Sequence, residues 1–268
     1  ALKGDVFDAP MNYRWYRSAR HFFNQSPDKI TVREFTDSLK SYSEGIRVQN
    51  QRAMMNLTAS HDVPRFSTSI YNKNKYKFRP SPFADPEYKI DKPDAETYRT
   101  MKLMLVQQFT YVGSPHIWAG DEMGMWGADD PSTRKPLIWP DLQFETEKVH
   151  PLGKPRDADP VQFNTDLFNF YRELIRMRKE WPVLASSDLK YLITDDKHEI
   201  LAYSRSDSDS EVLVLFNTSG QIQGIETELK YQGDYEQIMG NVDFRQVDGR
   251  IEAELPPRSF LIVGYSGV

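Results

Sequence analysis

The chain has 268 residues, a length that allows one large domain or two ordinary ones, and its 34 Lys and Arg against 39 Asp and Glu give a net charge of −5. This acidic balance gives no electrostatic basis for binding nucleic acid or an anionic membrane, and no apolar run approaches the roughly 18 residues of a membrane span. Cysteine is absent, which excludes disulfides, thiolate metal sites and a cysteine nucleophile, but leaves both a cytoplasmic and an extracytoplasmic location open.

Up to about residue 182 the sequence alternates short apolar runs with stretches of helical period, as β/α units do. The expected elements are, in chain order, a strand at 6–9, a helix at 14–23, a helix beginning at Thr31, a strand at 53–58, an irregular loop at 67–93, a helix at 94–111, a strand at 116–119, a turn-rich stretch at 123–164 and a helix at 166–181. Thr31 and Glu34 have the spacing of a capping box, and Asn164 is expected to cap the last helix.

From residue 183 the sequence changes to short β-type runs that are separated by turn residues. These runs are 190–194, 200–204, 212–217, 225–229, 251–255 and 260–265. We therefore expect two domains, an α/β unit at 1–182 and an all-β antiparallel sandwich at 183–268.

Three of the expected parallel strands end in polar residues, where ligands of such sheets bind. The three clusters are Asn12–Tyr13, Ser60–Asp62 and Gly120–Glu122. His61 and Asp62 can supply a donor and an acceptor to adjacent sugar hydroxyls, and a carboxylate here can stabilise an oxocarbenium ion. The alternative is a structural His-Asp turn in which Asp62 caps backbone amides.

Four segments follow one another along the chain: VFDAPMNY at 6–13, NLTASHDVPR at 56–65, QFTYVGSPHIWAGDEMGM at 108–125 and DDPSTRKPLIW at 129–139. In this order they resemble the α-amylase family of glycoside hydrolases, in its neopullulanase and cyclomaltodextrinase branch. They resemble the sixth strand, the seventh strand, the eighth strand with the preceding helix end, and the loop after the eighth strand. The resemblance implies the last part of a (β/α)8 barrel, strands six to eight, followed by the family's C-terminal sandwich.

The resemblance also implies roles for individual residues. Asp62 corresponds to the carboxylate that grips sugar hydroxyls at the cleavage subsite and stabilises the transition state, and His61 to its neighbour that binds the same sugar. Asp130 and Arg134 correspond to a pair that holds a glucose on the non-reducing side. An equally weighted alternative is that they form a salt bridge that only pins the loop.

Four further residues are given supporting roles near the site. Arg65 is expected to anchor the loop after the seventh strand. Asp121 and Glu122 are expected to support loop geometry, with a direct chemical role as the alternative. Tyr13 either lines the site or packs beneath it.

The sequence departs from the family in lacking its two reacting carboxylates. A retaining glycosidase needs a nucleophile and an acid roughly 5 Å apart. In the family these lie on strands four and five, the nucleophile in a Gly-x-Arg-x-Asp motif that is found nowhere in this sequence. We therefore expect a C-terminal piece of a larger enzyme that is inactive by itself.

The parent protein is expected to be a retaining hydrolase of α-1,4 links in starch, maltodextrin or cyclodextrin. Two alternatives are a non-catalytic glucan-binding or interaction protein derived from the family, and a transglycosylase on the same scaffold. The expected partners are an α-glucan oligosaccharide, the missing N-terminal half of the barrel and, through the exposed barrel edge, a second copy of the chain. No cofactor is expected in this chain, although a calcium ion in the preceding part of the barrel is compatible with the resemblance.

Two other patterns have weaker functional interpretations. Lysines, arginine and aromatics alternate at 72–79, which fits a solvated loop, sugar stacking or, against the acidic balance, nucleic acid. The acidic run 206–211 resembles part of a calcium loop but lacks its glycine and distal glutamate, so a hairpin turn is expected. The five histidines show no metal-ligand spacing.

Overall fold

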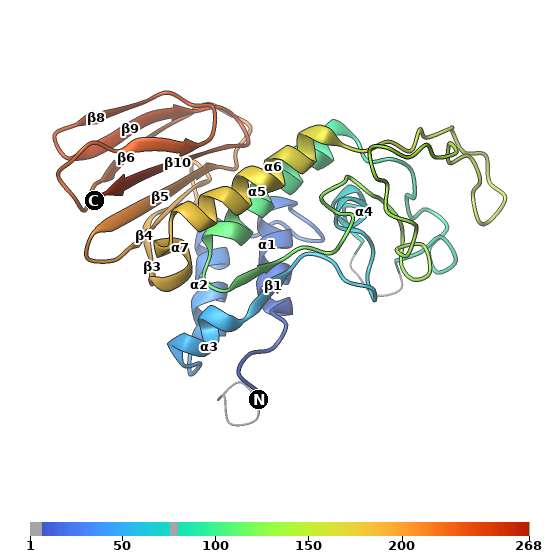
Figure 1. Cartoon of the computed structure of the whole chain (residues 1–268), viewed down its shortest axis with the longest axis horizontal. Coiled ribbons are helices and arrows are strands. Elements are labelled where there is room, and N and C mark those ends of the chain that lie inside the picture. The colour runs from blue at the N-terminus through green and yellow to red at the C-terminus, as the bar shows by residue number, and fades with distance from the viewer. Residues whose placement is uncertain (1–6, 76–79, 268) are drawn as a thin grey trace.

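The computed structural model describes residues 7–75 and 80–267. Helices pack beside two short parallel strands in the first part of the chain, and antiparallel sheets follow (Figure 1). The helices are α1 (Tyr13–Phe23), α2 (Val32–Ser43), α3 (Val48–Ala53), α4 (Phe66–Tyr71), α5 (Ala95–Thr110), α6 (Thr165–Glu180) and α7 (Val183–Ser186). The strands are β1 (Met55–Leu57), β2 (Ser114–His116), β3 (Leu189–Asp195), β4 (Ile200–Ser206), β5 (Ser210–Asn217), β6 (Gln223–Glu228), β7 (Glu236–Met239), β8 (Phe244–Val247), β9 (Arg250–Leu255) and β10 (Ser259–Ser266).

The predicted helix starts are confirmed in atomic detail. Thr31 Oγ1 accepts from Glu34 N at 3.2 Å while the Glu34 carboxylate accepts from Thr31 N at 2.8 Å, which completes the capping box of α2. Asn164 Oδ1 accepts from Leu167 N at 3.0 Å and caps α6. These caps satisfy amides that no helical carbonyl reaches, so they fix where each helix begins.

Several predicted strand bounds are wrong. The expected strand at 53–58 is only β1, because Ala53 still belongs to α3, and the expected strand at 116–119 is replaced by β2. Gly113, at φ +116°, turns the chain directly after α5, so pairing starts earlier than the apolar run suggests. Within the expected strand at 6–9, Val6 lies outside the described residues, and the described part shows no ladder.

The prediction that the stretch 67–93 is irregular is wrong for its first residues, because residues 67–71 belong to the helix α4. The prolines that indicate a loop begin only at Pro80, so they do not oppose a helix ending at Tyr71. Asn72 ends this helix, and its side-chain amide donates to Thr68 O at 2.9 Å.

The parallel strands form a partial barrel in which β1 is central. Met55 pairs with Ser114 on one side and forms a parallel bridge with Met11 on the other. Asn56 ties the three segments together: its carbonyl-type Oδ1 accepts from Asn12 Nδ2 at 2.8 Å, and its Nδ2 donates to Val112 O at 2.9 Å. The carboxyl ends of these segments consequently meet at one edge.

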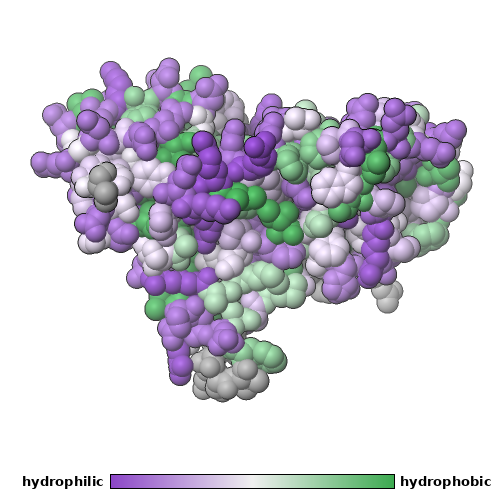
Figure 2. Space-filling view, viewed as in Figure 1, coloured by the Kyte–Doolittle hydropathy of each residue, from purple (hydrophilic) through white to green (hydrophobic). Residues whose placement is uncertain are grey.

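Hydrophobic residues are visible below the charged face of α6, over the part of the molecule that contains β1 and β2 (Figure 2). Phe7 and Met11, in the segment beside β1, are 65% and 40% exposed. Isolated sheet edges and apolar faces of this kind favour association. Association through this edge stays a prediction.

The C-terminal part is an antiparallel sandwich, as predicted. One sheet has the order β3-β4-β5-β10-β7 and the other β6-β9-β8. The short strands β7 and β8 were not expected, because they lie at sheet edges and alternate little between apolar and polar residues. The boundary between residues 182 and 183 stays a prediction. No helix among the described residues is both long and apolar enough to cross a membrane.

The outer face of the five-stranded sheet packs on the helices in one continuous core. Phe216 of β5 meets Phe23 of α1 edge-on, with ring centroids 5.3 Å apart. The Tyr203 hydroxyl of β4 lies 2.5 Å from Thr110 Oγ1 at the end of α5. The two parts of the chain therefore share their interior along this face.

Two arginines, the half-buried Arg178 and the buried Arg205, complete the C-terminal end of α5. Arg178 of α6 donates to Phe109 O and Gly113 O, both at 2.6 Å, and Arg205 of β4 donates to Thr110 O at 2.8 Å. Burial lowers the pKa of each guanidinium to about 10, which leaves both charged at neutral pH. Positive charge at this end also complements the helix dipole.

Replacing Arg205 with alanine should lower the free energy of unfolding by about 2–4 kcal/mol, because buried carbonyls lose charge-assisted hydrogen bonds. Urea titration measures this difference. Arg245→Ala, at an exposed site on β8, is the matched control and should change stability by less than about 1 kcal/mol. Equal losses in the two variants would contradict the role assigned to Arg205.

Candidate functional site

The turn after β1 places His61 and Asp62 in solvent at the carboxyl end of the parallel strands. Their side chains are 55% and 68% exposed, and His61 Nε2 lies 3.1 Å from Asp62 Oδ1. The His61 ring is 6.1 Å from that of Trp118, which follows β2, so the two strand ends meet here. A donor, an acceptor and an aromatic ring are the groups that a sugar ring requires.

Arg65, which lies beneath the protein surface, holds this turn in place. It is 2% exposed, and its Nη1 donates to Ala119 O at 2.5 Å and lies 3.4 Å from Asp121 Oδ1. Its backbone amide donates to Gly127 O at 3.1 Å. The loops that follow β1 and β2 are thereby held against each other, an arrangement that suits the anchoring role expected for Arg65.

Asp121 and Glu122 differ in environment although they are adjacent. Asp121 is 1% exposed, and burial raises its pKa to about 7 despite the opposing guanidinium of Arg65. Its Oδ2 has no hydrogen-bond partner among the described residues. Glu122 accepts from Gly120 N at 2.8 Å, within its own turn. Asp121 thus contacts the arginine that joins the two loops and Glu122 contacts the backbone, which suits the expected supporting role.

Gly120 explains why this turn is so tight. Its φ is +98°, and a Cβ there would lie 2.3 Å from Met125 Sδ and 3.2 Å from Arg65 Nη1. Only glycine fits both the backbone conformation and the close approach.

Asp130 and Arg134 form an ion pair in the loop after β2. Their side chains are about half exposed, at 51% and 52%. Asp129 shapes the turn by accepting from Asp130 N and, through its carbonyl, from Ser132 N, both at 2.9 Å. Among the described contacts, none joins this pair to His61 or Asp62, so both interpretations of the pair stay predictions.

Tyr13 is the first residue of α1, at the strand-end edge, and is half-buried. Asn12 caps that helix by accepting from Trp15 N at 3.2 Å, which orients the helix start. The position allows either of the roles predicted for Tyr13.

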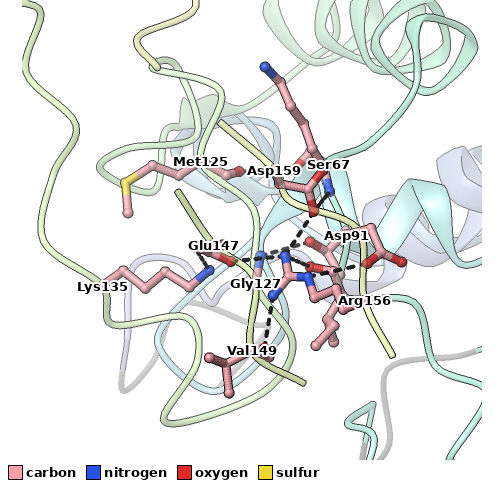
Figure 3. A network of polar contacts seen from close by, with 12 residues as sticks. Ser67, Asp91, Met125, Gly127, Lys135, Glu147, Val149, Arg156 and Asp159 are labelled. Carbon is pink, nitrogen blue, oxygen red and sulfur yellow. Dashed lines mark hydrogen bonds and ion pairs between the residues drawn. The ribbon is translucent and has the colours of Figure 1, made fainter. Parts of the chain in front are cut away.

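Sequence reasoning missed a half-buried ion network in the turn-rich stretch (Figure 3). Arg156 Nη2 contacts Asp159 Oδ2 at 2.9 Å and Glu147 Oε2 at 3.1 Å, while Lys135 Nζ reaches Glu147 Oε1 at 2.5 Å. These residues follow no period, so only the folded loop brings them together. Trp118 was equally missed as a site residue, although an aromatic directly after a strand end could have indicated it.

The described residues contain no group of three or more His, Cys, Asp or Glu placed to hold a metal. The acidic run 206–211 is the β4–β5 hairpin, as expected, where Asp207 Oδ1 accepts from Ser210 N at 2.8 Å. Of the basic and aromatic stretch 72–79, residues 76–79 lie outside the described residues, and Lys75 pairs with Asp85 at 2.5 Å.

Comparison with known families defines the class. Residues 2–187 match the family model described as alpha amylase, catalytic domain, and residues 190–262 match maltogenic amylase, C-terminal domain. The chain therefore belongs to the α-amylase family, and the resemblance seen in its sequence motifs is confirmed.

Particular relatives are cyclomaltodextrinases and neopullulanases. The chain is 28% identical over 262 residues to a cyclomaltodextrinase of Geobacillus thermopakistaniensis (strain MAS1), covering 97% of this chain and 37% of the relative. It is 31% identical over 232 residues to neopullulanase 2 of Thermoactinomyces vulgaris, covering 87% and 32%. The chain thus spans about a third of the length of these relatives.

Solved structures confirm the fold. A cyclomaltodextrinase matches with a TM-score of 0.70 at 24% identity, covering 97% of this chain and 37% of that one. The debranching enzyme of Nostoc punctiforme matches with a TM-score of 0.71 at 20% identity, covering 98% and 49%. Part of a (β/α)8 barrel followed by a β domain is the arrangement found.

The raised pKa of Asp121 has a measurable consequence. In the folded state Asp121 keeps a proton that the exposed carboxyl of the unfolded chain releases near pH 4. The stability that protonated Asp121 contributes is therefore fully present below about pH 4 and is lost as the pH rises through about 7. In urea titrations between about pH 5 and pH 8, the free energy of unfolding of the unaltered chain should fall by at least about 1 kcal/mol more than that of Asp121→Asn. Glu122→Gln is the control and should follow the unaltered chain; parallel curves for all three would contradict this assignment.

Proposed function

We propose that this chain supplies the sugar-gripping part of the active site of a retaining α-glucan hydrolase that acts on α-1,4 links in starch, maltodextrin or cyclodextrin. The observation that carries the proposal is the exposed His61–Asp62 pair at the ends of the parallel strands. Family membership and the names of the relatives, cyclomaltodextrinase and neopullulanase, support it.

In this proposal the Asp62 carboxylate accepts hydrogen bonds from adjacent hydroxyls of the sugar at the cleaved bond. As the bond breaks, positive charge develops on that ring, and the nearby carboxylate stabilises it more than it stabilises the substrate. His61 donates from a ring nitrogen to the same sugar. The Arg65 and Asp121 contacts keep the turn in place, so little reorganisation is needed on binding.

The neighbouring sugar is proposed to bind the Asp130–Arg134 pair. Both partners are half exposed, so a sugar hydroxyl can bond to carboxylate and guanidinium together. Tyr13 is proposed to line the same edge. The nucleophile and the acid would come from barrel strands outside these 268 residues.

The 268-residue chain alone should release no reducing sugar from maltodextrin or β-cyclodextrin, because in this proposal the paired carboxylates of a retaining glycosidase are supplied from outside it. A reducing-sugar assay checks this, with a cyclomaltodextrinase as the positive control. Turnover by the purified chain that survives removal of contaminants would contradict the proposed division of the site.

In a longer form of the protein that carries both reacting carboxylates, Asp62→Asn should lower kcat/KM for maltodextrin by about a hundredfold or more, or about 3 kcal/mol of transition-state stabilisation. The loss should fall mainly on kcat, because the interaction strengthens in the transition state. Asp141→Asn, an exposed acid in the loop after β2, is the matched control. An unimpaired Asp62→Asn enzyme would refute the role of Asp62.

A further inference from the structure

A pocket lies within the turn-rich segment after β2, and the exposed strand-end residues do not line it. Its volume is about 170 Å³. Its walls combine apolar and aromatic side chains with one ion pair, and are formed mainly by Met125, Trp126, Ile138, Phe144, Val161, Lys135 and Glu147. None of the residues assigned above to sugar binding or catalysis lines it.

The polar wall of the pocket is held rigidly. Lys135 Nζ meets Glu147 Oε1 at 2.5 Å, and the other oxygen of Glu147 lies 3.1 Å from Arg156 Nη2 (Figure 3). Arg156, whose side chain is only 4% exposed, is fixed in turn by Asp159 at 2.9 Å and Asp91 at 3.3 Å. The ammonium and carboxylate are therefore presented in one geometry, which lowers the entropy cost of binding a ligand.

Trp126 lines the pocket beside this pair and is itself 2% exposed. Lys135 Nζ lies 5.5 Å from the centroid of the same ring, which places the cation and the indole side by side.

The volume and the lining residues of the pocket limit the ligands that it can bind. The volume is well below the roughly 300–1,000 Å³ of pockets for drug-sized ligands, so one ring fits and a chain does not. Apolar walls suit the C–H faces of a sugar ring, and the ion pair offers a donor and an acceptor to neighbouring hydroxyls. We propose that this pocket binds a single glucose unit at an end or branch of an α-glucan, an inference that rests on the proposed function.

The pocket and the loop behind the strand ends share a contact at Gly120. Met125, which lines the pocket, packs against one side of this glycine, and the Arg65 guanidinium lies against it as well. A sugar in the pocket would therefore rest on the same loop that positions the His61 turn. Two sugar units of one glucan could be held on a common support.

Fluorine NMR of the full chain labelled with 5-fluorotryptophan tests the proposal. Trp126 reports on the pocket and Trp118, which is 6.1 Å from His61, reports on the strand ends. Each signal is assigned by its loss in Trp126→Phe or Trp118→Phe. Titration with methyl α-glucoside and with maltose should shift the Trp126 signal in a saturable way.

Two pocket variants and one control variant sharpen the test. Lys135→Met should weaken the Trp126 response about tenfold, because a charged donor is lost, while the exposed Lys148→Met should leave it unchanged. Val161→Phe, which fills the pocket from a half-buried position, should abolish the response in a chain that still gives dispersed fluorine signals.

The outcomes separate this inference from the proposed function. A shift of Trp118 without Trp126 overturns the pocket and leaves the strand-end site standing. A shift of Trp126 without Trp118 supports the pocket and counts against sugar binding at His61 and Asp62. If neither signal shifts, both the pocket and the strand-end site are overturned. An equal Trp126 response in Lys135→Met, in Val161→Phe and in the unaltered chain overturns the pocket alone.

Discussion

The carbonyl groups at the C-terminal end of α5 impose the constraint on which the two parts of the chain depend. A helix ends with carbonyls that have no partner in the helix, and burial makes each of them costly unless a donor is supplied. Arg178 supplies donors from the next helix and Arg205 from the second strand of the β domain. The chain then turns at Gly113 straight into β2, so the position of that strand is set by the same contacts.

The strand ends at the opposite edge carry the residues proposed to bind sugar, and they are built in a different way. The exposed pair, His61 and Asp62, stands on a buried one, Arg65 and Asp121. Burying a carboxylate with one unsatisfied oxygen is unfavourable, and the Arg65 guanidinium offsets part of this cost while it joins the two loops. Firm support of exposed side chains is what recognition of a hydroxyl pattern requires.

Much of the local structure follows from the sequence because its causes are local. The capping box of Thr31 and Glu34 and the cap at Asn164 involve residues three apart, so spacing alone predicts them. The exposed His61 and Asp62 were likewise found from a motif at a strand end. Edge strands β7 and β8 were missed, since their few residues show little alternation.

Long-range contacts of buried and half-buried charges could not be predicted in the same way. Arg205 lies in the run ILAYSRS, where a polar residue in a strand normally indicates a solvent-facing position, yet it is fully buried against α5. Lys135, Glu147 and Arg156 are brought together only by the folded loop, and charged residues in a turn-rich stretch are normally solvated. Tertiary burial decides these cases, and no pattern in the chain encodes it.

The contact between Arg205 and Thr110 spans 95 positions in the chain. During synthesis, the end of α5 leaves the ribosome well before the strand that completes its hydrogen bonds. The hydrogen bonds at this helix end therefore stay incomplete until the hairpin of β3 and β4 has emerged, although domains usually fold as they appear, N-terminal first. The β domain thus supplies the last partner of a helix that is synthesised well before it.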